Sequence, residues 1–409
     1  YNRLMYMMAE LPTDMMKNGL GMPNANLQDL EFLRFNSQNT FIKDMWKNCY
    51  SGISRANTAI AKIPEIKMNE SKKNRLIAEA RTLRALYYFN LVRFFGDVPL
   101  ILDLKTVEDS KGPRDSKELI YDQIIEDLTF AEEHLPLRSE YSASDEGRIN
   151  KGAAKILFGK VYLTKGDFQK AKDKLAEVVE HESEYGFGLH KDYHANWLRD
   201  TEAGIEAVLY IEYKEPPFQH NGEMALAGPK YSIPGSLGIS ALNEADIPTQ
   251  ELYDQFDNRD LRKKTNFKTE FAHLKTGEIL KSSIPLSGKF WVEGLETGDR
   301  CDVNMHIIRY ADAILMYAEA LNEVGKSTKA LAMLNRIRER AFGDDSGNFK
   351  PMSKDEFRTA ILNERRLEFP HEGHRWFDLV RTGTFIQRMK EHSAYEAKVA
   401  EANKTEIAQ

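Results

Sequence analysis

Apolar residues recur at steps of three and four along most of the chain, and no other feature limits its fold as strongly. One clear stripe, which ends before Gly96 and Pro99, comprises Leu76, Ala80, Leu83, Tyr87, Leu91 and Phe94. A stripe with this period forms the buried face of an amphipathic helix, and a glycine or proline after it ends the helix. The same reasoning predicts helices over residues 38–63, 116–135, 151–165, 168–181, 303–324, 327–340, 353–369 and 374–390.

Two pairs of these helices also carry small residues at matched positions. Gly159 and Ala318 each lie in the first helix of a pair, seven positions before a glycine that suits a tight turn. Five positions after that glycine, Ala171 and Ala330 lie in the second helix. Small residues at these points let two helices approach closely, which is typical of tetratricopeptide repeats. We therefore predict a mainly α fold in which tetratricopeptide-like helix pairs stack into a superhelix.

The region between residues 183 and 302 interrupts the helical pattern. It holds six of the 14 prolines and 11 of the 25 glycines of the chain. Residues 207–213 alternate in a way that predicts one β-strand, and turns fill most of the rest. Because rigid scaffolds usually display recognition residues on loops, we expect this insert to bind a ligand. The predicted organisation is a helical scaffold over 1–182, a loop-rich insert with short strands over 183–302, and helices over 303–409 that pack on the first block.

Charge and composition exclude several classes of protein. The 409 residues carry 57 basic and 63 acidic side chains, a formal net charge of −6, and no basic stripe, so nucleic-acid binding is not expected. No apolar run approaches the roughly 18 residues that a membrane-spanning helix needs. The two cysteines, Cys49 and Cys301, lie far apart without a CxxC motif, so the sequence leaves open whether they pair.

A search for catalytic and metal-binding motifs gives two weak leads. His371 and His374 flank Glu372 and Gly373, but a zinc-protease helix needs histidines four positions apart, and these are three apart. We therefore predict a turn there, and neither a metal nor a cofactor. Adjacent carboxylates are frequent, but they fall at solvated helix positions or in turns, whereas a glycosidase needs two that face each other across a sugar. A helical glycoside hydrolase is the less favoured alternative.

Aromatic residues in turn-rich segments are the best candidates for a binding site. A sugar ring presents a flat patch of C–H groups that covers an aromatic face, while its hydroxyl groups bond to polar side chains at the rim. The candidate residues that combine rings with polar neighbours are Phe35, Asn36, Phe218, His220, Asn221, Tyr231 and Trp291. For each of these rings, burial in the core is at least as good an explanation.

Several segments resemble the SusD/RagB family of surface nutrient-binding lipoproteins. They follow the family's order and read RANTAI at 55–60, EARTLRALYYFNLVRFFGDVPL at 79–100, RYADAILMYAEA at 309–320, NERRLEF at 363–369 and EGHRWFDLVR at 372–381. We expect opposite charges within 364–366 and 375–378 to pair and hold the last helices together. These motifs mark the scaffold of the family, and they identify no binding residue.

The resemblance implies a bacterial protein that a lipid anchors to the extracellular face of the outer membrane. It would bind an oligosaccharide or polysaccharide without catalysis and deliver it to a SusC-like TonB-dependent barrel. Family members take their ligand-binding rings from loops near the start and from the insert, the regions that hold Phe35, Phe218, Tyr231 and Trp291. The lipidated cysteine lies outside this sequence, and the family's proline-containing closing segment has no counterpart after Lys390. Peptide cargo on the same fold and a repeat-type interaction adaptor stay open as alternatives.

Overall fold

A computed structural model describes the fold of residues 4–19, 24–103, 112–214, 223–233 and 235–407. Over these residues the chain forms sixteen α-helices and six short strands, which confirms the predicted mainly α class. The helices are α1 (Leu4–Ala9), α2 (Ala25–Glu31), α3 (Thr40–Lys62), α4 (Glu70–Phe95), α5 (Lys117–His134), α6 (Lys151–Lys165), α7 (Phe168–Val179), α8 (Glu182–Tyr185), α9 (Glu223–Ala227), α10 (Gln250–Gln255), α11 (Lys263–Asn266), α12 (Tyr310–Glu323), α13 (Ser327–Phe342), α14 (Lys354–Glu368), α15 (Arg375–Arg381) and α16 (Phe385–Ile407). The strands are β1 (Met16–Lys17), β2 (Ala207–Ile211), β3 (Ile247–Pro248), β4 (Phe267–Ala272), β5 (Ile279–Ser287) and β6 (Met305–Arg309). None of the helices described here is both long and apolar enough to cross a bilayer.

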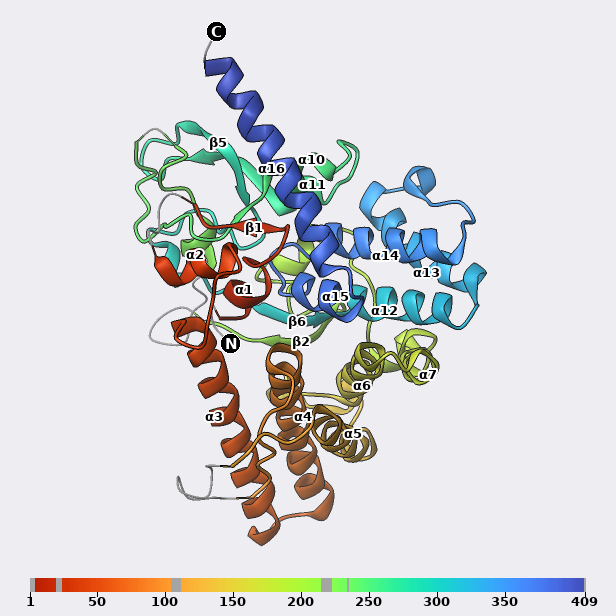
Figure 1. Cartoon of the computed structure of the whole chain (residues 1–409). Coiled ribbons are helices and arrows are strands. Elements are labelled where there is room, and N and C mark those ends of the chain that lie inside the picture. Colours follow the sequence, from red (N-terminus) through yellow and green to blue (C-terminus); the bar gives the residue numbers. More distant parts are fainter. Residues whose placement is uncertain (1–3, 20–23, 104–111, 215–222, 234, 408–409) are drawn as a thin grey trace.

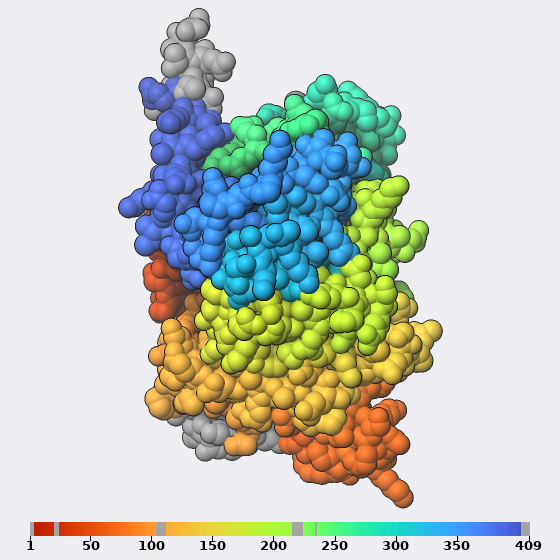
Figure 2. Space-filling view, turned by 90° about the vertical axis from the view of Figure 1, so that its right-hand side faces the viewer, coloured from red at the N-terminus to blue at the C-terminus, as the bar shows by residue number. Residues whose placement is uncertain are grey.

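Helices from both ends of the chain stack along one side of the molecule (Figure 1). Figure 2 shows this side, where α12 to α14 lie above α6 and α7, and these lie above α5. The pair α6–α7 turns at Gly166, with φ of 79°, and the pair α12–α13 turns at Gly325, with φ of 76°. Positive φ values favour glycine, so both turns lie where the small-residue pattern predicted them.

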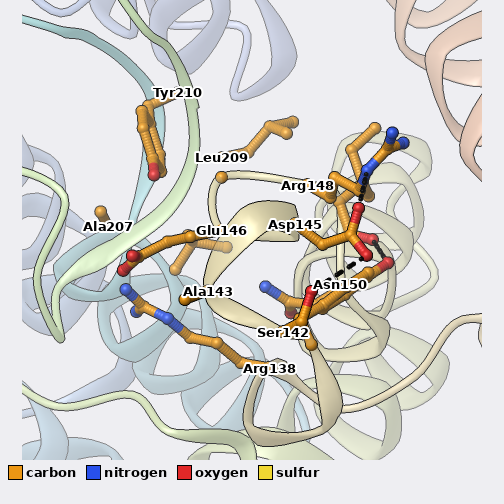
Figure 3. A pocket seen from close by; sticks show the side chains of 14 residues that line it. Arg138, Ser142, Ala143, Asp145, Glu146, Arg148, Asn150, Ala207, Leu209 and Tyr210 are labelled. Carbon is orange, nitrogen blue, oxygen red and sulfur yellow. Dashed lines mark hydrogen bonds and ion pairs between the residues drawn. The ribbon is translucent and has the colours of Figure 1, made fainter.

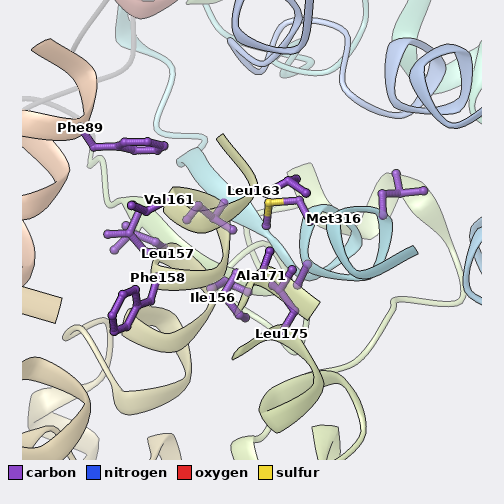
Figure 4. Packing of buried hydrophobic residues seen from close by; sticks show 14 of the residues in the cluster. Phe89, Ile156, Leu157, Phe158, Val161, Leu163, Ala171, Leu175 and Met316 are labelled. Atoms are coloured by element: carbon purple, nitrogen blue, oxygen red, sulfur yellow. The ribbon is translucent and has the colours of Figure 1, made fainter. Parts of the chain in front are cut away.

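Close approach of the paired helices depends on small residues. A Cβ built on Gly159 of α6 would lie 2.5 Å from Cγ of Leu175 on α7, so a side chain there would push the helices apart. Ala171 and Ala330, at the matching points of the second helices, are fully buried. Figure 4 shows Leu175 and Ala171 among the apolar side chains of the core cluster that joins both helical blocks. The predicted tetratricopeptide-like packing is therefore present.

The segment before α12 is a strand, whereas the sequence predicted a helix from residue 303. β6 pairs antiparallel with β2, in a register that places Tyr210 opposite His306 and Ile211 opposite Met305. The helical period extends back through this segment, but the edge of β2, distant in the chain, presents unpaired backbone groups that need a partner. Long-range pairing therefore overrides the local period. Two further antiparallel ribbons, β1–β3 and β4–β5, lie in and beside the insert.

The helix predicted over residues 374–390 is split in two. α15 ends at Arg381, and α16 begins at Phe385. Gly383 between them has φ of 70°, and its N–H donates to the carbonyl oxygen of Val380, which closes α15. α16 then continues to Ile407 and projects beyond the body of the molecule (Figure 1). The polar, alanine-rich end of the chain, for which no helix was predicted, is thus helical through residue 407.

Buried ion pairs hold the strands against the last helices. The guanidinium group of Arg309, which is fully buried, contacts the carboxylates of Glu206, just before β2, and Glu368, at the end of α14. Between α14 and α15, Nε of Arg365 lies 2.7 Å from Oδ2 of Asp378. This contact confirms the charge pairing predicted for the last helices. Such charge-assisted bonds are short and directional, so they fix the geometry of the elements that they join.

The two cysteines do not form a disulfide bond. Cys49 and Cys301 are both free and buried, and they belong to separate apolar clusters. Burial raises the pKa of each thiol to about 12. Both are therefore protonated at neutral pH and pack as small apolar residues.

Candidate functional site

Among the candidate rings in the described residues, Tyr231 is the most open to solvent. It lies in the turn between α9 and β3 and is 58% exposed, whereas Phe35 is 36% exposed. Nζ of the neighbouring Lys230 lies 5.2 Å from the centre of the Tyr231 ring. An exposed ring with an ammonium group beside it offers a flat apolar face next to a hydrogen-bond donor, the combination that sugar binding requires.

A single buried carboxylate fixes the backbone beneath this ring. Oε1 of Glu244 accepts hydrogen bonds from the backbone N–H groups of Lys230, Tyr231 and Ser232, at 2.6, 2.8 and 2.8 Å, and from the Ser232 hydroxyl at 2.7 Å. Burial alone would raise the pKa of Glu244, but the hydrogen bonds outweigh burial and lower the pKa from its usual value. Consecutive N–H groups that converge on an anion form a nest. We call residues 230–232 with Glu244 the Glu244 nest.

Glu244 itself is held in an unusual backbone conformation. Its φ is 52°, a region that residues other than glycine rarely adopt. Its N–H donates to the carbonyl oxygen of Gly228, and its own carbonyl oxygen accepts from the N–H of Gly19. A Cβ on Gly19 would lie 2.2 Å from that oxygen, so only glycine permits the contact. Bonds on both sides thus maintain a strained conformation of the kind that clusters at ligand sites.

A second group of exposed rings follows α2. Phe32 and Phe35 are 59% and 36% exposed, and Leu33 between them has φ of 56°, which turns the chain after the helix. Asn36 is also exposed, and its Oδ1 accepts a hydrogen bond from the N–H of Gln38, so the side chain shapes the turn before α3. The sequence identified Phe35 and Asn36 as candidates but not Phe32, because no turn-forming residue stands beside Phe32.

The two groups of rings extend from segments that pack on each other. Leu27 of α2 shares a buried cluster with Leu226 of α9 and with Ala245, the residue after the nest carboxylate. In Figure 1, α2 lies beside the insert, above the start of α3. We refer to three residues together as the exposed rings: Phe32, Phe35 and Tyr231.

The structure gives Trp291 a partly structural position. Its ring lies edge-on against Phe271 of β4, with 4.6 Å between the ring centres, and its indole nitrogen is buried. Trp291 therefore supports the β4–β5 ribbon, and its role in ligand binding stays a prediction. The remaining candidates, Phe218, His220 and Asn221, lie outside the described residues.

A polar cavity of about 240 Å³ lies between β2 and the turns that follow α5 (Figure 3). Three of its charged side chains, Arg138, Asp145 and Arg148, are bound to other groups of the protein. The guanidinium group of Arg138 donates to the carbonyl oxygens of Gly204 and Ala203, and Asp145 accepts from Nε of Arg148 at 2.8 Å. The bonds of Arg138 join the first helical block to the insert, so we treat the cavity as part of that junction and assign no ligand to it.

The leads for catalysis and metal binding do not converge on a site in the described residues. His371 to Gly373 form a turn, as predicted, and His371 has φ of 57°. Within the described ranges, no group of three or more His, Cys, Asp or Glu side chains is placed to hold a metal ion. Burial raises the pKa of Glu10 and Asp246, a property that general acids share, but both residues are 0% exposed and out of reach of a substrate.

Comparison with known proteins gives matches at both ends of the chain. A family model described as the SusD family matches residues 284–409, and one described as starch-binding associating with outer membrane matches residues 2–163. The SusD-like protein P2 of Formosa agariphila is 31% identical over 380 residues, which cover 84% of this chain and 72% of that protein.

Solved structures agree with these matches along nearly the whole chain. A laminarin binding SusD-like protein is 28% identical, with a TM-score of 0.80, over 95% of this chain and 88% of the other. A SusD superfamily protein from Parabacteroides distasonis is 27% identical, also with a TM-score of 0.80, over 92% of this chain and 82% of the other. From these matches and the helix-pair fold, the chain belongs to the SusD/RagB family.

Proposed function

We propose that the protein binds a glycan through Tyr231 and the other exposed rings, and that it acts by binding alone. The observation that carries the proposal is that the ring of Tyr231 is exposed although the Glu244 nest holds its backbone in place. A backbone that is already ordered loses little further entropy when a ligand stacks on the ring, so more of the contact energy appears as affinity. The similar SusD-like protein described as laminarin binding supports a glycan as the ligand.

The expected affinity for a single site is modest. An aromatic contact contributes about 0.5–1.5 kcal/mol beyond its buried area, and a hydrogen bond at the rim contributes about 1 kcal/mol. Two stacked rings and two or three rim bonds therefore give about 4 kcal/mol, which corresponds to a Kd of about 1 mM. A polysaccharide that reaches several sites at once binds more tightly, because the later contacts are intramolecular.

In this proposal the helical blocks 1–182 and 303–409 form the frame, and the insert 183–302 carries most of the recognition residues. Among the candidates from the insert, Trp291, Phe218, His220 and Asn221 then contribute to the same function as Tyr231, and so do Phe35 and Asn36. A lipid anchor holds the frame at the extracellular face of the outer membrane, over a SusC-like TonB-dependent barrel that receives the glycan. The second family model is described as starch-binding associating with outer membrane, and this description supports the location. Co-purification of such a barrel from native membranes, and metabolic labelling with a fatty acid, test the two associations.

Binding to a polysaccharide panel tests the glycan itself. Affinity electrophoresis and isothermal titration with laminarin, starch, mannan, xylan and galactan should identify at least one ligand. For that ligand we expect Tyr231→Ala to weaken binding about tenfold, the loss of one stacking contact of about 1.4 kcal/mol, at an unchanged Tm. Tyr395→Ala on α16 is the matched control and should bind like the wild type. Binding of none of the polysaccharides, or release of reducing sugar from any of them, would contradict the proposal.

A further inference from the structure

A recess runs along one side of α3, apart from the exposed rings. Residues of α3 line it at steps of three and four, and the extended segment after α4 forms its opposite wall. Its volume is about 310 Å³, within the range of small-ligand sites. In Figure 1, α3 extends from α2 toward the end of the molecule opposite the insert. The lining residues that matter here are Trp46, Tyr50, Ser54, Asn57, Pro99 and Asp103.

Two aromatic rings of α3 line this recess, and neighbouring groups fix both of them. Trp46 and Tyr50, both half-buried, have ring centres 5.2 Å apart and an angle of 48° between their planes. Phe95 holds Trp46 edge-on, with ring centres 5.1 Å apart. The Tyr50 hydroxyl donates to the carbonyl oxygen of Pro99 in the opposite wall at 2.8 Å, which fixes the position of this ring. The guanidinium group of Arg114 also lies over the Trp46 ring, 5.6 Å from its centre. The rings thus offer a preformed aromatic surface with a cation beside it, on which a sugar can stack.

The mouth of the recess is polar on both walls. Ser54 of α3 and Asp103 of the opposite wall are both exposed, so a hydroxyl and a carboxylate flank the rings. Asn57 serves the scaffold, because its amide donates to the carbonyl oxygen of Ile101 and accepts from Arg84. A carboxylate accepts hydrogen bonds from sugar hydroxyls but repels sulfate and uronate groups. Arg114, over the Trp46 ring, brings the opposite charge, so neither sign dominates at the recess. The mixed charge therefore favours a neutral sugar.

We propose that this recess is a second carbohydrate site, which binds one or two residues of a neutral glycan independently of Tyr231. The class of ligand rests on the proposed function, whereas the location rests on the recess alone. A second site on the same molecule raises the avidity for a long polysaccharide, because the first contact brings the chain close to the second.

Fluorine NMR of protein labelled with 5-fluorotryptophan tests this site directly. The chain has four tryptophans, so Trp46→Phe assigns the Trp46 resonance by its loss. The probes are laminarihexaose, cellohexaose, maltohexaose, mannohexaose and xylohexaose, each added up to about 10 mM, tenfold above the Kd expected for one weak site. With at least one probe, the Trp46 resonance should shift saturably in the wild type and equally in the Tyr231→Ala variant.

Two matched substitutions on α3 decide the outcome. Ser54→Arg places a long side chain at the mouth of the recess and should weaken the Trp46 response at least tenfold, a cost of about 1.4 kcal/mol. Ser51→Arg adds the same charge to another exposed serine of α3, outside the recess, and should leave the response unchanged. No shift of Trp46 with any probe, a shift that Ser54→Arg does not weaken, or a shift lost in Tyr231→Ala would overturn the second site. The proposed function is tested separately, since it fails only if the exposed rings do not bind a glycan.

Discussion

Replacing Glu244 by glutamine tests whether the nest prepares Tyr231 for binding. The substitution keeps the size of the side chain and one carbonyl oxygen, but it removes the charge that four donors share. Hydrogen bonds to an ionised acceptor are roughly twice as strong as neutral ones. We therefore expect the Glu244→Gln variant to fold, with residues 230–232 opening more often.

The magnitude follows from the number of bonds. A hydrogen bond to a charged group contributes about 1 kcal/mol more than a neutral one. Four such bonds set an upper limit of about 4 kcal/mol on the stabilisation that the charge of Glu244 provides. Because the four donors share one oxygen, the actual value is lower, and we take about 1.4 to 4 kcal/mol as its range. Because each 1.4 kcal/mol is tenfold, the amides of residues 230–232 should exchange with solvent about 10 to 1,000 times faster.

Hydrogen exchange followed by mass spectrometry measures this opening, and a double-mutant cycle connects it to binding. Re-ordering a freed side chain costs about 0.5–1.5 kcal/mol, so Glu244→Gln should weaken glycan binding by a factor of about 2 to 12. If Glu244 acts only through the ring, the same substitution in the Tyr231→Ala background should have no further effect. Glu278→Gln, an exposed glutamate in the turn between β4 and β5, is the matched control.

Acid should release the same nest. The pKa of Glu244 is lower in the folded protein than its unfolded value of 4.5. The stabilisation that ionised Glu244 provides is therefore complete above pH 4.5 and is lost as the pH falls through the folded pKa. The protection of the amides of residues 230–232, corrected for the intrinsic exchange rate at each pH, should therefore fall as the pH drops below 4.5 in the wild type, and this fall should be absent from Glu244→Gln. Unchanged exchange in the variant, or losses of affinity that add fully in the cycle, would refute the reasoning.

Three further predictions concern stability and Trp291. Arg309→Ala removes one cation from buried carboxylates that keep other partners, such as Arg340 for Glu206 and Glu368, so the buried cluster loses a positive charge that its acids need. We expect a loss of about 3–5 kcal/mol in the free energy of unfolding, against less than about 1 kcal/mol for the exposed Arg358→Ala; equal Tm values for the two variants would contradict this. Burial raises the pKa of Asp246 from 3.8 to about 7, so between these pH values the folded protein retains a proton that the unfolded chain releases, and stability falls as the pH rises. Urea titrations should show that the free energy of unfolding depends less steeply on pH in Asp246→Asn. An unchanged pH dependence would exclude Asp246 as its source. Trp291→Ala should weaken glycan binding and also lower the free energy of unfolding by about 2 kcal/mol, less than for a fully buried ring, because the indole packs on Phe271. An unchanged affinity for the glycan would remove Trp291 from the proposed site.

Much of the helical frame was predictable because its information is local. The apolar period places α6 at residues 151–165, as predicted, and α5 and α14 within two residues of their predicted ends. The small residues of the helix pairs could also be interpreted from the sequence, because they predict close helix packing. The structure shows this packing at Gly159, which lies against Leu175. Steps of three and four positions describe neighbours on one helix face, so the sequence contains this relation directly.

Exposure of the candidate rings depended on the tertiary structure. Turn-forming neighbours made Tyr231 a candidate, but its exposure depends on Glu244, which lies 13 positions later at a positive φ. Trp291 also lies in a turn-rich part of the sequence, yet its ring packs edge-on against Phe271 of β4. The same limit explains β6, whose partner β2 is distant in the chain. Sequence period by itself thus determined most of the long helices, although not the strand β6 or the end of α16. Contacts between remote segments decided which rings face solvent, because a side chain's burial depends on what packs against it and not on its neighbours in sequence.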